Sequence, residues 1–209
     1  MATRYTTFTE GEFYHIYNRG VDKRIIYQTT EDYLRFQQLL YIANTNEPIN
    51  VRDLKKKYDS IFEYKKETEL VAIGAYCLMP NHFHILLTPL SDVAVSTFMN
   101  KLTTSYSMYF NKRYDRTGRL FEGSFKSKHI DIDEYLKYMF AYIHLNPQKL
   151  YGNKQDMFIQ TLHYRFSSLY DYLYNNREES NILEPSRFPK YFKNARDHLD
   201  ELLEWINLD

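Results

Sequence analysis

Two histidines separated by one residue are the clearest candidates for chemistry in this sequence. They lie in residues 79–87, MPNHFHILL, where His82 and His84 flank Phe83 in an apolar and aromatic run. Such a run predicts a β-strand, and because side chains alternate along a strand, both imidazoles should project from the same face. Two imidazoles on one rigid face can hold a metal ion. A buried strand would otherwise carry apolar residues at both positions, so these polar groups are costly unless they find partners.

The single cysteine, Cys77, limits the kind of metal site that the histidines can form. A closed structural zinc site needs further cysteine or histidine ligands at ligand spacing, and the sequence offers none. A site of few imidazoles completed by oxygen ligands favours Mg²⁺ or Mn²⁺, which assist phosphate chemistry. We therefore expect a divalent metal ion, Mg²⁺ or Mn²⁺, as cofactor.

A second candidate lies in residues 141–147, AYIHLNP. Tyr142 and Asn146 are four positions apart and share a helix face. If the Asn146 amide binds a metal ion, the tyrosine could act on a phosphate that is bound to that ion. Spacing alone favours a plainer interpretation, in which Tyr142 is a core aromatic among apolar neighbours. His144 is an alternative third ligand: it points about 200° away from Tyr142 in a regular helix, but unwinding before Pro147 would turn it inward.

The hydrophobic pattern predicts the strands and helices that must hold these side chains. In chain order we expect a strand at 13–17, a helix at 31–43, strands at 70–79 and 83–88, a helix at 92–114, two short strands within 116–130, a helix from 133 to near 146, and short terminal helices. Pro80 and Asn81 favour a tight connection, so the strands on either side should form an antiparallel hairpin at the centre of a sheet. The order predicts an α+β fold with helices packed on an antiparallel sheet.

The composition bounds the class of protein. The chain has 209 residues, 44% of them hydrophobic, which is enough for one substantial core with appendages. Residues 44–68 mix lysines with acids and are expected to form a charged, partly helical insertion with a solvated surface. The 27 basic and 27 acidic residues balance, which excludes a globally basic chromatin-type protein but allows a local nucleic-acid surface. Apolar runs are short and no signal-peptide pattern is present, so we expect a cytoplasmic protein with no membrane partner.

In several segments the sequence resembles the HUH superfamily of single-strand DNA transposases, named for two histidines around a hydrophobic residue. The resemblance is to the REP-associated tyrosine transposases and their insertion-sequence relatives. The matching stretches, in the family's order, are YHIYNRG at 14–20, MPNHFHILL at 79–87, GRLFEGSFKSK at 118–128, YIHLNP at 142–147 and YRFSS at 164–168. MPNHFH followed by a helix-ending YIHLNP is quite specific. The insertion at 44–68 has no counterpart in the family's pattern.

The resemblance implies a ferredoxin-like antiparallel sheet, with the histidine pair on a central strand and a nucleophilic tyrosine on a following helix. Carried over by position, the nucleophile is Tyr142 and the metal ligands are His82, His84 and Asn146. His144 lies close enough in sequence to leave the third ligand open. Residues 1–150 would then form the catalytic core, and residues 151–209 a helical extension packed on it.

The implied activity is that of a metal-dependent DNA nickase and strand transferase. It would act on single-stranded or hairpin DNA, such as repetitive palindromic elements, through a 5′-phosphotyrosine, and work at the nucleoid of a prokaryote as a monomer or a homodimer. The alternative is a non-catalytic single-stranded DNA- or RNA-binding module, a domesticated descendant on the same fold.

A local basic segment agrees with a DNA partner. Residues 101–130 carry seven Lys or Arg against two acids, a net charge of +5 that can bind phosphates, although a solvated helix end explains it about as well. The candidate DNA-binding residues are Arg19, Lys112, Arg113, Arg116, Arg119, Lys126 and Lys128.

Overall fold

A four-stranded antiparallel sheet forms the centre of the computed structural model, which describes residues 7–48, 50–151 and 154–208. The strands are β1 (Phe13–Arg19), β2 (Val71–Met79), β3 (His82–Pro89) and β4 (Lys126–Ile130). They lie in the order β2-β3-β1-β4, so the strand that carries both histidines is central, as predicted. Pro80 and Asn81 form the two-residue connection between β2 and β3, because Met79 pairs directly with His82.

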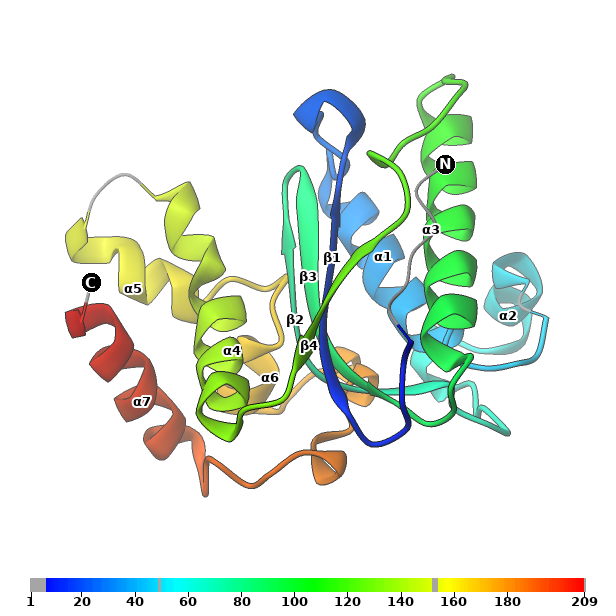
Figure 1. Cartoon of the computed structure of the whole chain (residues 1–209). Helices are drawn as coiled ribbons and strands as arrows, with labels where there is room; N and C mark the ends of the chain where they lie inside the picture. The colour runs from blue at the N-terminus through cyan, green and yellow to red at the C-terminus, as the bar shows by residue number, and fades with distance from the viewer. Residues whose placement is uncertain (1–6, 49, 152–153, 209) are drawn as a thin grey trace.

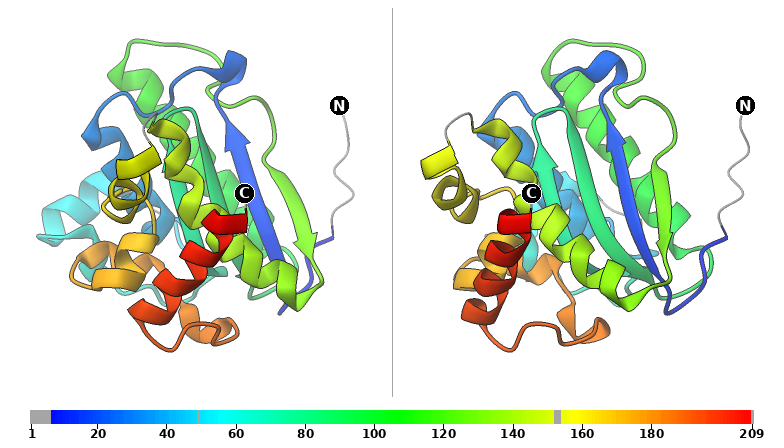
Figure 2. Two further views of the ribbon diagram at one scale, coloured as in Figure 1. Left: turned by 90° about the vertical axis from the view of Figure 1, so that its left-hand side faces the viewer. Right: turned by 60° about the vertical axis from the view of Figure 1, so that its left-hand side comes forward.

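Helices lie on both sides of this sheet, with α1 (Thr30–Ile42) and α3 (Ala94–Arg113) packed on one face and α4 (Asp133–Leu145) on the other (Figure 1). Later in the chain follow α5 (Lys154–Leu162), α6 (Leu169–Tyr174) and α7 (Ala195–Leu208). The order β1-α1-β2-β3-α3-β4 is that of a ferredoxin-like fold. The predicted fold class, an α+β protein with helices packed on an antiparallel sheet, is confirmed. Figure 2 shows α4 and α7 lying in front of the sheet.

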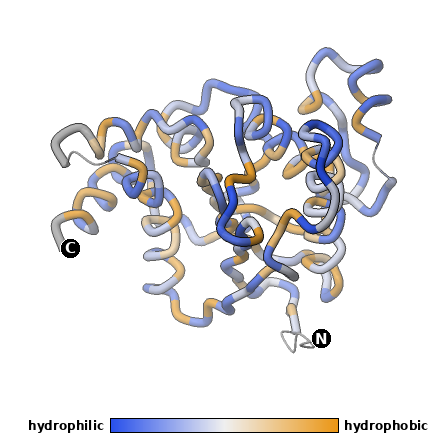
Figure 3. The backbone as a smooth tube through the Cα atoms, turned by 90° about the horizontal axis from the view of Figure 1, so that it is seen from above, coloured by the Kyte–Doolittle hydropathy of each residue, from blue (hydrophilic) through white to orange (hydrophobic). Residues whose placement is uncertain are grey.

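The alternation of side chains along β3 assigns them to two separate cores. Phe83, Ile85 and Leu87 pack with α1 and α3, whereas Leu86 packs with the apolar residues of α4. Since His82 and His84 alternate in phase with Leu86, they belong to the face that α4 covers. Hydrophilic and hydrophobic residues alternate along the helices around the sheet, as Figure 3 shows near the C-terminus.

The outer edge of β2 is covered by the chain after α5. The backbone N–H of Ser168 donates to the carbonyl of Tyr76, and the N–H of Glu184 donates to that of Ile73, each at 2.9 Å. These bonds satisfy strand groups that an exposed edge would present to other chains.

Two stretches differ from their sequence-based expectations. Within 116–130 there is one strand, β4, rather than two, and Phe121 forms only an isolated bridge with Gly20. Positive φ angles at Gly118 and Gly123 interrupt an extended strand there. The helix at 133–145 ends as expected, but Pro147 does not end the winding of the chain. A 3₁₀ turn, η3 (Asn146–Leu150), follows directly, because proline is tolerated in the first turn of a helix.

The remaining elements are short. The insertion at 44–68 contains α2 (Val51–Lys57) and the turn η2 (Ile61–Glu63), and the other 3₁₀ turns are η1 (Val21–Lys23), η4 (Glu178–Ile182) and η5 (Pro185–Arg187). Within the described parts of the chain, every helix is too short or too polar to span a bilayer.

Asn44 fixes the start of β2 through three hydrogen bonds to backbone groups. Its side chain is 3% exposed. Its Oδ1 accepts from the N–H groups of Leu70 (3.0 Å) and Val71 (2.9 Å), and its Nδ2 donates to the carbonyl of Val71 (2.8 Å). One buried amide thus joins the end of α1 to the strand that flanks β3.

We predict that Asn44→Ala lowers the free energy of unfolding by about 3 kcal/mol or more, because three buried backbone groups lose their partners. Asn50→Ala, which removes the exposed cap of α2, should cost only about 1 kcal/mol. Urea denaturation followed by circular dichroism measures both. Equal losses for the two variants would contradict this role of Asn44.

Candidate active site

A cavity of about 380 Å³ lies where β1 and β3 meet the end of α4. His82 and His84 of β3 line it together with Tyr142 of α4. Arg19 lines it from the end of β1, and Lys126 lines it from the start of β4. The structure therefore brings the histidine pair and the candidate tyrosine into one cavity, although they are separated by 58 residues or more in sequence.

Both imidazoles are oriented through their Nδ1 atoms. The Nδ1 of His82 lies 2.6 Å from the Oδ1 of Asn81, and the Nδ1 of His84 lies 2.9 Å from the Nε2 of His15 on the neighbouring strand. Since an amide oxygen can only accept, His82 carries its proton on Nδ1, which leaves its Nε2 with a lone pair. The two rings are perpendicular, with centroids 5.0 Å apart.

Burial keeps these imidazoles in their neutral form. It is the largest cause that lowers the pKa of His82 and that holds the pKa of His84 well below its usual value, and the nearby charge of Lys149 lowers both further. The pKa of His15 falls to about 4, because of burial first and Lys128 second. A neutral imidazole is the form that binds a metal ion.

Tyr142 is half-buried and faces the histidines. Its ring centroid lies 5.6 Å from that of His84 and 5.9 Å from that of His15, both edge to face. It also packs against the apolar residues of α4 and the sheet, as the plainer interpretation expects. Among the described residues no hydrogen bond holds its hydroxyl, which leaves that group available to a ligand in the cavity.

Asn146 and His144 point to opposite sides of the helix end. Asn146 is 1% exposed; its Nδ2 donates to the carbonyl of Tyr142 (3.2 Å), and its Oδ1 accepts from Lys149. His144 is completely buried on the far side, where its ring nitrogens bond to Ser168 (2.8 Å) and His198 (2.9 Å).

The donor set of this cavity fits a divalent metal ion. Two neutral imidazoles line it, and the buried amide of Asn146 lies behind the lining, where its Oδ1 accepts from the cavity residue Lys149. The residues present supply no thiolate. Within the described ranges no three His, Cys, Asp or Glu side chains are grouped to hold a metal, so a site here depends on the Asn146 amide. Such a set leaves coordination positions for water or phosphate oxygens, as suits Mg²⁺ or Mn²⁺.

The seven candidate DNA-binding residues do not form one patch. Arg19 and Lys126 line the cavity, where the guanidinium of Arg19 forms a two-pronged ion pair with Glu122 at 2.6 and 2.8 Å. Lys128 lies in an adjoining hollow and donates to the hydroxyl of Tyr135 (2.8 Å).

The other four residues lie away from the cavity. Arg113 is ion-paired with Glu31 (3.7 Å) and Asp32 (3.6 Å). Arg116 and Arg119 line two further hollows, and Lys112 is exposed on α3.

Sequence reasoning did not identify Lys149 or Glu122 as part of this cavity. The Nζ of Lys149 lies 5.1 Å from the centre of the Tyr142 ring and donates to the Oδ1 of Asn146 at 3.3 Å. In a 3₁₀ helix, residues three positions apart lie on the same side. The sequence would therefore have placed Lys149 beside Asn146 if a 3₁₀ turn had been expected after α4. The sequence around Glu122 does not indicate that this residue lies at the cavity, because its partner Arg19 is on a strand that is distant in sequence.

Comparisons with known proteins agree with this architecture. A solved structure described as "Structure of the REP associates tyrosine transposase bound to a REP hairpin" is similar over 90% of this chain and 92% of that one. The TM-score is 0.53 and the sequence identity 15%, so the two proteins share a fold. No curated protein matches the sequence.

The family model described as "Transposase IS200 like" matches residues 36–146, just over half of the chain, from α1 through both histidines to Asn146. The chain belongs to the IS200-like transposase family.

Proposed function

We propose that this protein is a DNA nickase and strand transferase that cuts single-stranded or hairpin DNA through a 5′-phosphotyrosine on Tyr142. The observation that carries the proposal is the shared cavity of Tyr142 and the His82–His84 pair. Membership of a transposase family supports it. A residue that served only the core would not need a ring that faces a buried and a half-buried imidazole.

The proposed reaction exchanges one phosphoester bond for another. The phenolic oxygen of Tyr142 attacks the scissile phosphorus and forms a new P–O bond, while the bond from phosphorus to the 3′ oxygen breaks. The phenolic proton passes to solvent, and the departing 3′ oxygen takes up a proton. Because the phosphotyrosine keeps the ester energy, a 3′-hydroxyl can later attack it and rejoin a strand without ATP.

The residues of the cavity have separate tasks. His82, His84 and Asn146 would hold a divalent ion, Mg²⁺ or Mn²⁺, which when bound supplies charge stabilisation to an oxygen of the phosphate. Lys149 adds a fixed positive charge beside the nucleophile. The Asn146 oxygen has two lone pairs, so it can serve Lys149 and a metal together.

The substrate is proposed to be DNA with an unpaired segment, because the scissile phosphate must reach a cavity between α4 and the sheet. Arg19 and Lys126 at this cavity would bind the backbone of that strand. Hairpins of repetitive palindromic elements are the proposed natural form, in line with the REP hairpin that is bound in the similar solved structure. We further propose a catalytic core at 1–150, a helical extension at 151–209, and action at the nucleoid in the cytoplasm.

We predict that Tyr142→Phe abolishes a covalent protein–DNA adduct, since the attacking oxygen is lost while the ring still packs. The assay incubates the protein with single-stranded DNA and Mn²⁺ and resolves the adduct on a denaturing gel. Tyr17→Phe, which removes another hydroxyl from the same cavity, should still form the adduct. If Tyr142→Phe retains it, another residue is the nucleophile.

The proposed ligand set predicts which substitutions lower the affinity for Mn²⁺ and which do not. His82→Ala and Asn146→Ala should each weaken Mn²⁺ binding at least about tenfold, because each removes a direct ligand and even outer-shell changes cost about that much. His144→Gln should leave binding nearly unchanged, since His144 bonds to Ser168 and His198 instead. Electron paramagnetic resonance of free Mn²⁺ gives the affinities. A larger effect of His144→Gln than of Asn146→Ala would make His144 the third ligand.

Lys149→Met should raise the affinity for Mn²⁺ but lower the rate of adduct formation. Removal of this charge relieves a repulsion on the order of 1 kcal/mol, so Mn²⁺ should bind about fivefold tighter. Adduct formation should nevertheless slow, because the phosphate loses a cation. Lys112→Met, at an exposed site on α3, is the matched control and should change neither quantity. Weaker Mn²⁺ binding in Lys149→Met would be inconsistent with this role.

A further inference from the structure

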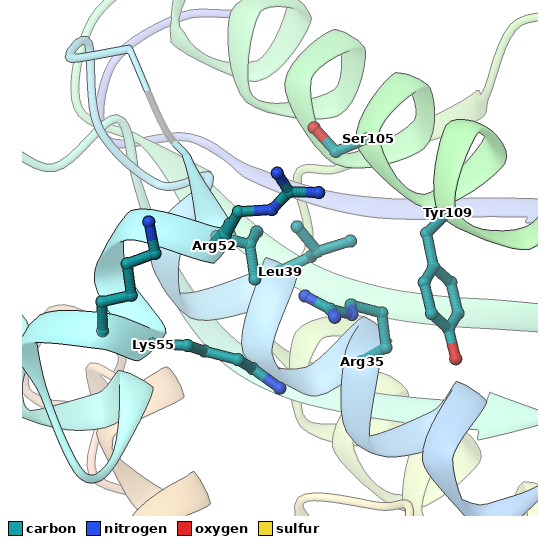
Figure 4. A pocket seen from close by; sticks show the side chains of 8 residues that line it. Arg35, Leu39, Arg52, Lys55, Ser105 and Tyr109 are labelled. Atoms are coloured by element: carbon teal, nitrogen blue, oxygen red, sulfur yellow. The ribbon is translucent and has the colours of Figure 1, made fainter. Parts of the chain in front are cut away.

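A second cavity, of about 540 Å³, is lined by residues of α1, α2 and α3 (Figure 4). These helices lie on the other side of the sheet from α4 (Figure 1). The lining of the cavity carries four cationic side chains and no acidic one. They are Arg35 of α1 and Arg52, Lys55 and Lys56 of α2. In Figure 4 the side chains of Arg35, Arg52 and Lys55 converge around Leu39.

Three of these four cations lack a carboxylate partner among the described residues. Among the described residues no ion pair involves Arg35, Arg52 or Lys55, and Lys56 reaches only Asp53, at 4.0 Å between two exposed side chains. Arg35 is half-buried over the ring of Tyr109, 4.9 Å from its centre. Burial and the charge of Arg35 both lower the pKa of Lys55, in that order. The cavity therefore holds like charges that an anion would stabilise.

The nearest acidic side chains on α1 are already engaged. Asp32 is completely buried and accepts from the hydroxyls of Tyr109 (2.9 Å) and Tyr114 (2.6 Å). Glu31 and Asp32 both pair with Arg113. Neither carboxylate of α1 is free to neutralise the four cations, and the Asp53 carboxylate of α2 reaches only Lys56.

The geometry points to a second DNA contact: we infer that this cavity binds backbone phosphates of a duplex stem while the unpaired segment lies in the active site. The inference rests on the proposed function for its substrate. Guanidinium and ammonium groups beside the hydroxyl of Ser105 are suited to phosphate oxygens. The cavity's aromatic ring, Tyr109, has Arg35 over one face, so that face is not offered for the base stacking typical of single-strand sites.

The path between the two sites also carries positive charge, of which Arg24 reaches Asp22 only at 3.8 Å. A hollow of about 790 Å³ beside Pro80, at the turn before the histidines, is lined by Arg24, Arg116 and the start of α1. From there α1 runs toward Arg35 and Leu39 at the second cavity. A stem that leaves the active site at this turn can follow α1 to that cavity. Contacts of this kind position DNA without reading its sequence.

The salt dependence of hairpin binding tests the inference. Arg52→Gln with Lys55→Gln should lower the slope of log Kd against log salt concentration by about 0.9 for each lost phosphate contact, or about 1.8 in total. The matched control, Lys57→Gln with Lys65→Gln, removes the same charge from exposed positions of the same insertion outside the cavity and should lower the slope much less. The probe is a hairpin of arbitrary sequence with a single-stranded overhang, measured by fluorescence anisotropy.

Three outcomes would overturn the stem contact. The first is an equal change of slope for the two double variants. The second is an equal change when the probe is the overhang alone, without a stem. The third is an unchanged slope together with a rise in Tm of the unmodified protein on adding inorganic tripolyphosphate, which would make the cavity a site for a small polyphosphate. Adduct formation on the overhang alone is measured separately, so failure of the proposed chemistry is distinguishable from failure of the stem contact.

Discussion

The burial of β3 on both faces is the constraint on which the candidate site depends. A polar side chain on such a strand must find a partner, since an unpartnered buried polar group costs several times the net gain of an ordinary hydrogen bond. His84 meets that requirement through His15 on the adjacent strand, at 2.9 Å. The antiparallel pairing of β1 with β3, with Tyr17 opposite His84 and His15 opposite Leu86, sets this contact. Two strands thus hold one imidazole in a fixed orientation before any ligand binds.

The packing of α4 supplies the other half of the site. Leu136, Met139, Phe140 and Ile143 bury one stripe of this helix against the sheet. That stripe sets the rotation of the helix, which turns Tyr142 toward the cavity and His144 toward Ser168 and α7. The 3₁₀ turn after α4 then returns Lys149 to the side of Asn146. The Tyr142 hydroxyl, the Asn146 amide and the Lys149 ammonium therefore share one continuous segment, and groups held in this way are preorganised, as phosphate chemistry requires.

The sheet, the central hairpin and the helix of the tyrosine could be predicted from the sequence because each has a local signal. Alternation in MPNHFHILL identifies β3, Pro80 and Asn81 identify its turn, and the helical period identifies α4. Other features have no local signal. The ion pair of Arg19 with Glu122 joins residues that only the sheet brings together, and the +5 segment at 101–130 is dispersed because its members lie on a helix, a loop and a strand. Pro147 correctly indicates the end of the α-helix. It gives no indication of the 3₁₀ turn that follows and that carries Lys149.

Peptide mapping of the covalent complex tests the central claim most directly. The protein would be incubated with single-stranded DNA and Mn²⁺, digested with nuclease and protease, and analysed by mass spectrometry. We expect one peptide to carry a nucleotide bound through its 5′ phosphate, with fragmentation that assigns the modification to Tyr142. A nucleotide on any other residue, or a cleaved strand with no modified peptide, would contradict this account.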